Sequence, residues 1–186
     1  CGRFDEVVQI KDEPNGEINR SMYDFSRGYA FLKEGNIEAA RAILDSLQDL
    51  TKTTAARFRF HAGKDIVGAM AGILEGEIAW SEGKMEAAVD AFKKSTSFYE
   101  NLNYDEPEPL PFSPRHWLGA AYMEIGAHSN ALEEYKKDLT EHPHNLWALW
   151  GVKEALTKLD SSDLEIEREL EAALSIADIW LPNTKL

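Results

Sequence analysis

The residue types that could hold a metal ion here are five histidines, one cysteine and an excess of acidic residues. The closest histidines, His142 and His144, flank Pro143 in a segment expected to be an exposed turn. A closed metal site needs about four converging ligands, and the single cysteine, Cys1, is remote in the sequence. We therefore expect no metal site and no cofactor.

Residue patterns for covalent or acid–base catalysis are also missing. No serine or cysteine lies in a recognisable nucleophile motif, and the chain has no glycine-rich phosphate-binding loop. The glutamates of residues 165–171 have the spacing of a solvated helix face rather than of an acid–base pair. We expect no catalytic residue, and the chain is not predicted to be an enzyme.

A short glycine-led phrase occurs four times, beginning at Gly2, Gly35, Gly83 and Gly126. In three of the four phrases an acidic residue stands three positions after the glycine. In all four a small or branched apolar residue stands five positions after it. Self-similarity at a spacing of about 20 to 50 residues is typical of stacked repeat proteins. Glycine also tolerates the left-handed conformation at a helix C-terminus, which places the phrase in the turn of a helical hairpin.

Apolar residues recur at helical spacing on both sides of these glycines. The pattern predicts helices over residues 22–34, 37–50, 55–82, 85–102, 114–125, 130–142, 146–159 and 163–179, and no strands. Gly63 is expected to break the third helix near its start, and Asp163 to cap the last one. A proline-rich segment, 103–114, interrupts the helices, because Pro107, Pro109, Pro111 and Pro114 cannot continue a helix.

These elements predict an all-α fold of stacked helical hairpins. We expect a single domain over 15–186, with repeats at about 20–50, 55–102, 113–143 and 146–179, preceded by a remnant of a truncated repeat over 1–14. Cys1 could instead be the lipidated first residue of a mature lipoprotein. Since Gly2 lies where a hairpin turn is expected, we interpret Cys1 as an internal residue of a longer protein.

The hairpins resemble the tetratricopeptide repeat. The third unit carries the spacing most clearly, at Leu118, Gly119, Tyr122, Gly126, Ala131, Tyr135 and Pro143. The second unit matches in part, at Gly76, Gly83, Ala88 and Phe92, and so does the first, at Gly28, Phe31, Gly35, Ala40 and Leu44. The resemblance implies a right-handed α-solenoid. Phrases such as 104–107 and 147–149 further resemble the C-terminal half of larger bacterial tetratricopeptide-repeat proteins that have no assigned activity.

The resemblance places the first helix of each hairpin on the concave face of the stack. Seven side chains are then expected near a peptide-binding groove: Phe25, Tyr29, Trp80, His116, Trp117, Trp147 and Trp150. Aromatic rings are common interface anchors. The alternative is that these rings pack between helices and form part of the core.

The proline-rich segment has two interpretations of its own. Tyr104 and Asp105 could fold over the groove rim, with Arg115 paired to Asp105 or Glu106. The same residues could instead form a surface spacer held by a structural ion pair.

Charge narrows the class of partner. The net charge of −13 repels phosphate backbones and anionic lipids, so nucleic acids and membrane surfaces are not expected partners. A neutral-apolar or basic protein segment fits better, and a cytoplasmic location is expected.

The predicted function is that of a protein- or peptide-binding scaffold. One alternative is a helical accessory region of a larger enzyme whose active residues lie upstream. Another is a homodimer formed through the first hairpin.

Overall fold

The computed structural model describes residues 4–177 and residue 185. The predictions for Cys1, for Gly2 and for residues 178–184 and 186 of the tail concern residues outside the described part of the chain. The described residues form nine α-helices and one short β-hairpin: α1 Phe4–Gln9, α2 Glu17–Lys33, α3 Ile37–Thr53, β1 Arg57–Phe58, β2 His61–Ala62, α4 Gly63–Ser81, α5 Met85–Tyr99, α6 Arg115–Glu124, α7 His128–Glu141, α8 Leu146–Lys158 and α9 Leu164–Ile176. The all-α fold is confirmed.

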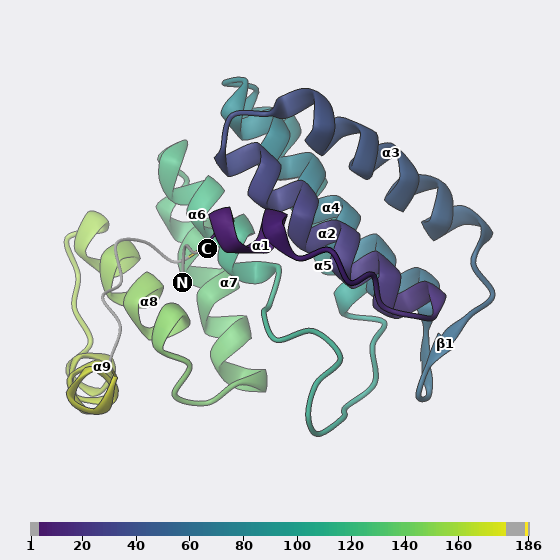
Figure 1. Cartoon of the computed structure of the whole chain (residues 1–186). Helices are drawn as coiled ribbons and strands as arrows, with labels where there is room; N and C mark the ends of the chain where they lie inside the picture. The colour runs from purple at the N-terminus through teal and green to yellow at the C-terminus, as the bar shows by residue number, and fades with distance from the viewer. Residues whose placement is uncertain (1–3, 178–184, 186) are drawn as a thin grey trace. The chain divides into compact units, whose positions relative to one another are not determined.

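The chain divides into two compact units, residues 1–114 and 115–186. In unit 1, helices α2 to α5 pack as two successive hairpins, and α4 packs against α2, α3 and α5 (Figure 1). In unit 2, α6 to α9 form two further hairpins in the same order. Each unit is described by itself, and the single domain over 15–186 stays a prediction.

The three predicted glycine turns adopt one conformation. Gly35, Gly83 and Gly126 have φ values of 84°, 74° and 77°. In each turn the residue after the glycine donates its N–H to the carbonyl five residues back, as in Asn36 to Phe31 at 2.8 Å. This bond satisfies a carbonyl that the helix end would leave unpaired.

The turn between α8 and α9 repeats this geometry without a glycine. Asp160 takes the positive φ, at 51°, and Ser161 donates its N–H to the Leu156 carbonyl at 2.9 Å. Asp163 then caps α9 as predicted, because its carboxylate accepts from the N–H groups of Glu165 and Ile166.

Close contact between paired helices depends on glycines that face large side chains. A methyl group on Gly76 of α4 would lie 2.3 Å from the Phe92 ring of α5. In unit 2, Tyr135 of α7 lies against Gly119 of α6 and Gly151 of α8, where added methyl groups would come within 2.4 and 2.6 Å of its ring. The buried rings therefore lie directly on helix backbone.

The prediction of one helix over 55–82 without strands is wrong at its start. Residues 57–62 form an antiparallel hairpin in which Arg57 pairs with Ala62 and Phe58 with His61. Arg59 turns the chain with φ 53°, and the Gly63 N–H bonds to the Ala56 carbonyl, so α4 begins only at Gly63. Strands of two residues are too short to show an alternating pattern.

Other helix ends differ from the prediction by up to five residues, because element boundaries are the least certain part of a sequence-based prediction. Helix α2 begins at Glu17, α3 extends to Thr53 and α9 ends at Ile176. Within the described residues, no helix has both the length and the apolar character needed to cross a bilayer.

Substitution of Gly76 by alanine tests the close contact between α4 and α5. The added methyl group would collide with the buried Phe92 ring, so we expect the free energy of unfolding to fall by about 1–3 kcal/mol. Urea denaturation measures it. Gly83→Asn is the control, because no atom lies within 4 Å of its added Cβ and asparagine tolerates a positive φ; an equal loss in both variants would contradict the packing argument.

Candidate functional site

The aromatic residues predicted for the groove in unit 1 are mostly covered by other segments of that unit. Phe25 is 5% exposed and its ring centroid lies 5.6 Å from that of Phe112, in the proline-rich segment. Tyr29 is equally buried, 5.9 Å from the Phe4 ring of α1. The interpretation that these rings pack in the core therefore holds for both, whereas Trp80, near the end of α4, is half-buried.

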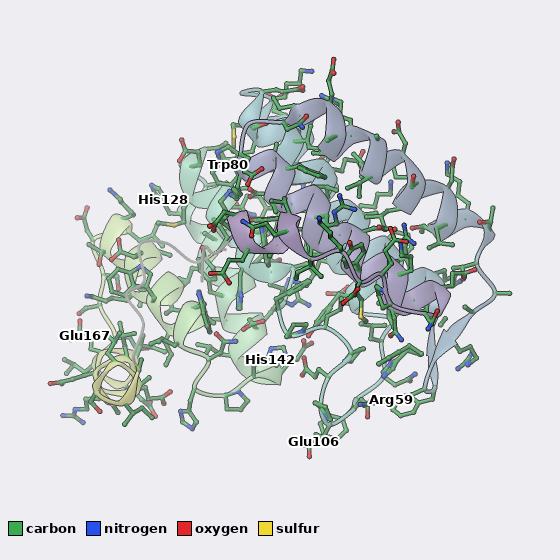
Figure 2. All side chains as sticks on the ribbon, viewed as in Figure 1. Arg59, Trp80, Glu106, His128, His142 and Glu167 are labelled. Atoms are coloured by element: carbon green, nitrogen blue, oxygen red, sulfur yellow. The ribbon has the colours of Figure 1, made fainter. Side chains whose placement is uncertain are left out.

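The proline-rich segment is tied to the β-hairpin. Asp105 accepts hydrogen bonds from the Arg59 guanidinium and lies 3.1 Å from His61 Nε2, while Arg59 also donates to the Pro107 carbonyl at 2.9 Å. His61 is buried, and Arg59, labelled in Figure 2, is half-exposed. Asp105 pairs with Arg59 and His61, and Arg115 pairs with Glu134, while the pairing of Arg115 with Asp105 or Glu106 stays a prediction.

Two groups in this segment have shifted pKa values. Burial raises the pKa of the Asp105 carboxyl, but the hydrogen bonds from His61 and Arg59 outweigh burial and hold that pKa below its ordinary value. Tyr104 is 82% exposed, and its hydroxyl donates to Glu106, which raises the pKa of the phenol. Asp105 therefore anchors the segment, and Tyr104 projects from it.

Asp105→Asn tests this anchor. At neutral pH we expect faster proteolytic cleavage within residues 103–112 of the variant than of the unchanged chain, because the bond to the charged Arg59 is weakened. The folded-state pKa of Asp105 lies below its unfolded value of about 3.9. The stabilisation is therefore complete above about pH 4 and is lost as pH falls through the lower folded pKa.

The measurement is limited proteolysis at pH 7, together with hydrogen exchange of the segment as the pH is lowered. The variant and the unchanged chain should converge as Asp105 becomes protonated. Equal cleavage at pH 7 would contradict the anchor.

In unit 2, a row of charged and polar side chains is buried between α6 and α7. Arg115 pairs with Glu134 at 2.6 Å. One turn along, Asp138 is fully buried, with His116 Nε2 3.0 Å from one carboxylate oxygen and His142 Nδ1 3.1 Å from the other (Figure 2 labels His142). His116, predicted for the groove, thus serves the contact between these two helices.

This cluster joins helices α6 and α7. Each histidine nitrogen faces a different oxygen of the same carboxylate. Over residues 4–177, no group of three or more histidine, cysteine or acidic residues is arranged to hold a metal ion. Trp117, beside His116, is 1% exposed and belongs to the core of unit 2.

Asp138→Ala is expected to lower the free energy of unfolding of the chain by about 2 kcal/mol or more, because two imidazoles lose a buried acceptor. Urea denaturation followed by circular dichroism measures this. Asp90→Ala, at an exposed site on α5, is the control. A loss no larger than that of the control would show that the cluster adds nothing to stability.

The remaining predicted residues, Trp147 and Trp150, lie on an open face of α8. Both are half-buried, and Glu154 continues their stripe one turn further on. The Lys153 ammonium lies 5.3 Å from the centre of the Trp150 ring, a cation–π distance. Among the candidates in unit 2, these indoles are the large rings with exposed surface.

An open groove adjoins this face. It has a volume of about 420 Å³ and is lined by Lys153 of α8 and by Glu167, Leu170, Glu171 and Leu174 of α9. Sequence analysis did not select these residues. The signal that could have found them is the apolar stripe of α9, which runs from Leu170 to Leu174, one turn further on and 37% exposed.

The structure therefore separates the predicted site residues. Phe25, Tyr29, His116 and Trp117 are buried, while Trp80, Trp147 and Trp150 keep exposed surface. The arrangement offers apolar rings, a lysine and two carboxylates at a surface, which suits the binding of another chain.

A family model described as a tetratricopeptide repeat matches residues 73–102, which cover the second half of α4 and all of α5. Two of the matched residues are Gly76 and Phe92, which form the close contact described above. Comparison with curated proteins and comparison with solved structures each gave no significant match.

Proposed function

We propose that this chain, in which a tetratricopeptide-repeat model matches residues 73–102, binds a segment of a partner protein through the partly exposed face of α8. Helical repeats of this family generally mediate contacts between proteins. The resemblance places the first helix of each hairpin on the concave face, and α8 is the first helix of the last hairpin. Trp147 and Trp150 are the proposed anchors.

The observation that supports this proposal is the partial exposure of two indoles on one helical stripe. Trp147 and Trp150 are three residues apart, so both rings project from the same side of α8. Tryptophan buries a large apolar area at little cost in conformational entropy, and it is enriched among the residues that dominate binding energy. A groove beside these rings adds concave surface.

The charge of the chain selects among partners. A net charge of −13 disfavours nucleic acids and anionic membranes as ligands. The partner segment is neutral-apolar or basic.

Selection from a random peptide library on the full chain tests the proposal. We expect enriched peptides to bind Trp150→Ala at least about tenfold more weakly than the unchanged chain, as for the loss of a central anchor. Trp147→Ala should weaken the same peptides. Affinities are measured by fluorescence anisotropy, with folding checked by circular dichroism.

Tyr104→Ala is the matched control, since it removes a more exposed ring from the other unit. Enriched peptides that bind both tryptophan variants as tightly as the unchanged chain would refute the α8 surface. Loss of binding in the Tyr104 variant alone would move the site to the proline-rich segment.

A further inference from the structure

The groove between α8 and α9 has an apolar floor and an acidic rim. Leu170 and Leu174 lie one helical turn apart on α9, and Glu167 and Glu171 lie one turn apart beside them. Side chains four residues apart on a helix have Cβ atoms about 5–6 Å from each other. The leucines and the glutamates therefore form two parallel pairs along the groove.

The two rim carboxylates are open to solvent. Glu167 and Glu171 are both exposed, and among the described residues neither forms an ion pair with a lysine, arginine or histidine (Figure 2 labels Glu167). Lys153, the cation that lines the groove, has its ammonium over the Trp150 ring. The rim is thus complementary to a positively charged ligand.

The apolar floor of the groove is only partly covered by the rest of the unit. Leu170 is buried against the unit, but Leu174 is 37% exposed at the open end of the groove. Both leucines face the same groove as the carboxylates. A ligand that matches them must present apolar and basic side chains together.

On the premise of the proposed function, we infer that the partner segment is a basic amphipathic helix. Apolar side chains at i and i+4 of that helix fill the groove over Leu170 and Leu174. Lysines or arginines that flank them pair with Glu167 and Glu171. A helix fits because the pairs in the groove repeat once per helical turn, which is the spacing that one face of a partner helix presents.

Lys153 links the groove to the proposed tryptophan face. It lines the groove, and its ammonium lies over the Trp150 ring. The tryptophans would supply apolar anchoring, and the glutamates would set the charge preference. Rim charges act chiefly on specificity and on the association rate, and their effect falls with added salt.

Charge exchange tests the inference on the full chain. The probe is a synthetic amphipathic helical peptide with leucines on one face and flanking lysines, and its counterpart has glutamate in place of every lysine. We expect the lysine peptide to bind the unchanged chain, and Glu167→Lys/Glu171→Lys to weaken it by about tenfold or more. The same double variant should gain affinity for the glutamate peptide.

Asp45→Lys/Asp49→Lys is the matched control. It makes the same change in net charge at two exposed acidic residues with the same spacing, on α3 of unit 1. We expect it to bind the lysine peptide as the unchanged chain does at physiological salt. An equal loss in the control would overturn the inference, since it would show attraction by overall charge alone.

The outcomes also separate the inference from the proposed function. Library-selected peptides that lose affinity for Trp150→Ala but not for Glu167→Lys/Glu171→Lys would overturn the inference and leave the proposed function standing. No binding of either the lysine peptide or a selected peptide would overturn both. Leu174→Ala, at a site that is 37% exposed, should also weaken binding of the lysine peptide, with folding checked by circular dichroism. Unchanged affinity would show that the leucines do not contribute to binding.

Discussion

Large buried side chains that pack directly on glycine backbone set the distance between neighbouring helices in both units. In unit 1, the Phe92 ring lies on Gly76; in unit 2, Tyr135 lies between Gly119 and Gly151. A side chain at any of these glycines would force the helices apart, because protein cores have little free volume. The positions of the remaining side chains, including those that reach the surface, follow from this spacing. The residues that the family model matches include Gly76 and Phe92.

The surface that remains open on unit 2 is a consequence of how its helices are joined. Buried pairs between α6 and α7, such as His116 with Asp138, fix the contact between those helices and remove His116 from any binding role. Helix α9 is the last described helix, and its main contact within the unit is with α8. Leu174 of α9 and the indoles of α8 are left partly exposed, and Glu167 and Glu171 of α9 line the groove with Leu174.

Much of the fold could be predicted from sequence because the turns depend on local chemistry. Gly35, Gly83 and Gly126 adopt the expected positive φ, and Asp163 caps its helix. The turn at Asp160 escaped detection, since aspartate reaches that conformation less often than glycine. Which binding candidates are exposed was harder to predict from sequence. Helical spacing predicts which side of a helix a ring occupies, but it does not predict which other segment covers that ring. Phe25 lies against Phe112, which is far along the chain. The short β-hairpin that anchors Asp105 shows no alternation of apolar and polar residues in the sequence.

The most direct test of the α8 surface is the indole N–H region of the NMR spectrum, recorded while a library-selected peptide is titrated into the full chain. The chain has five tryptophans, so each indole can be assigned by substitution. We predict that the signals of Trp147 and Trp150 shift on binding, while the signal of buried Trp117 moves little. Shifts confined to Trp80, with Trp147 and Trp150 unchanged, would contradict the account and place the binding surface on unit 1.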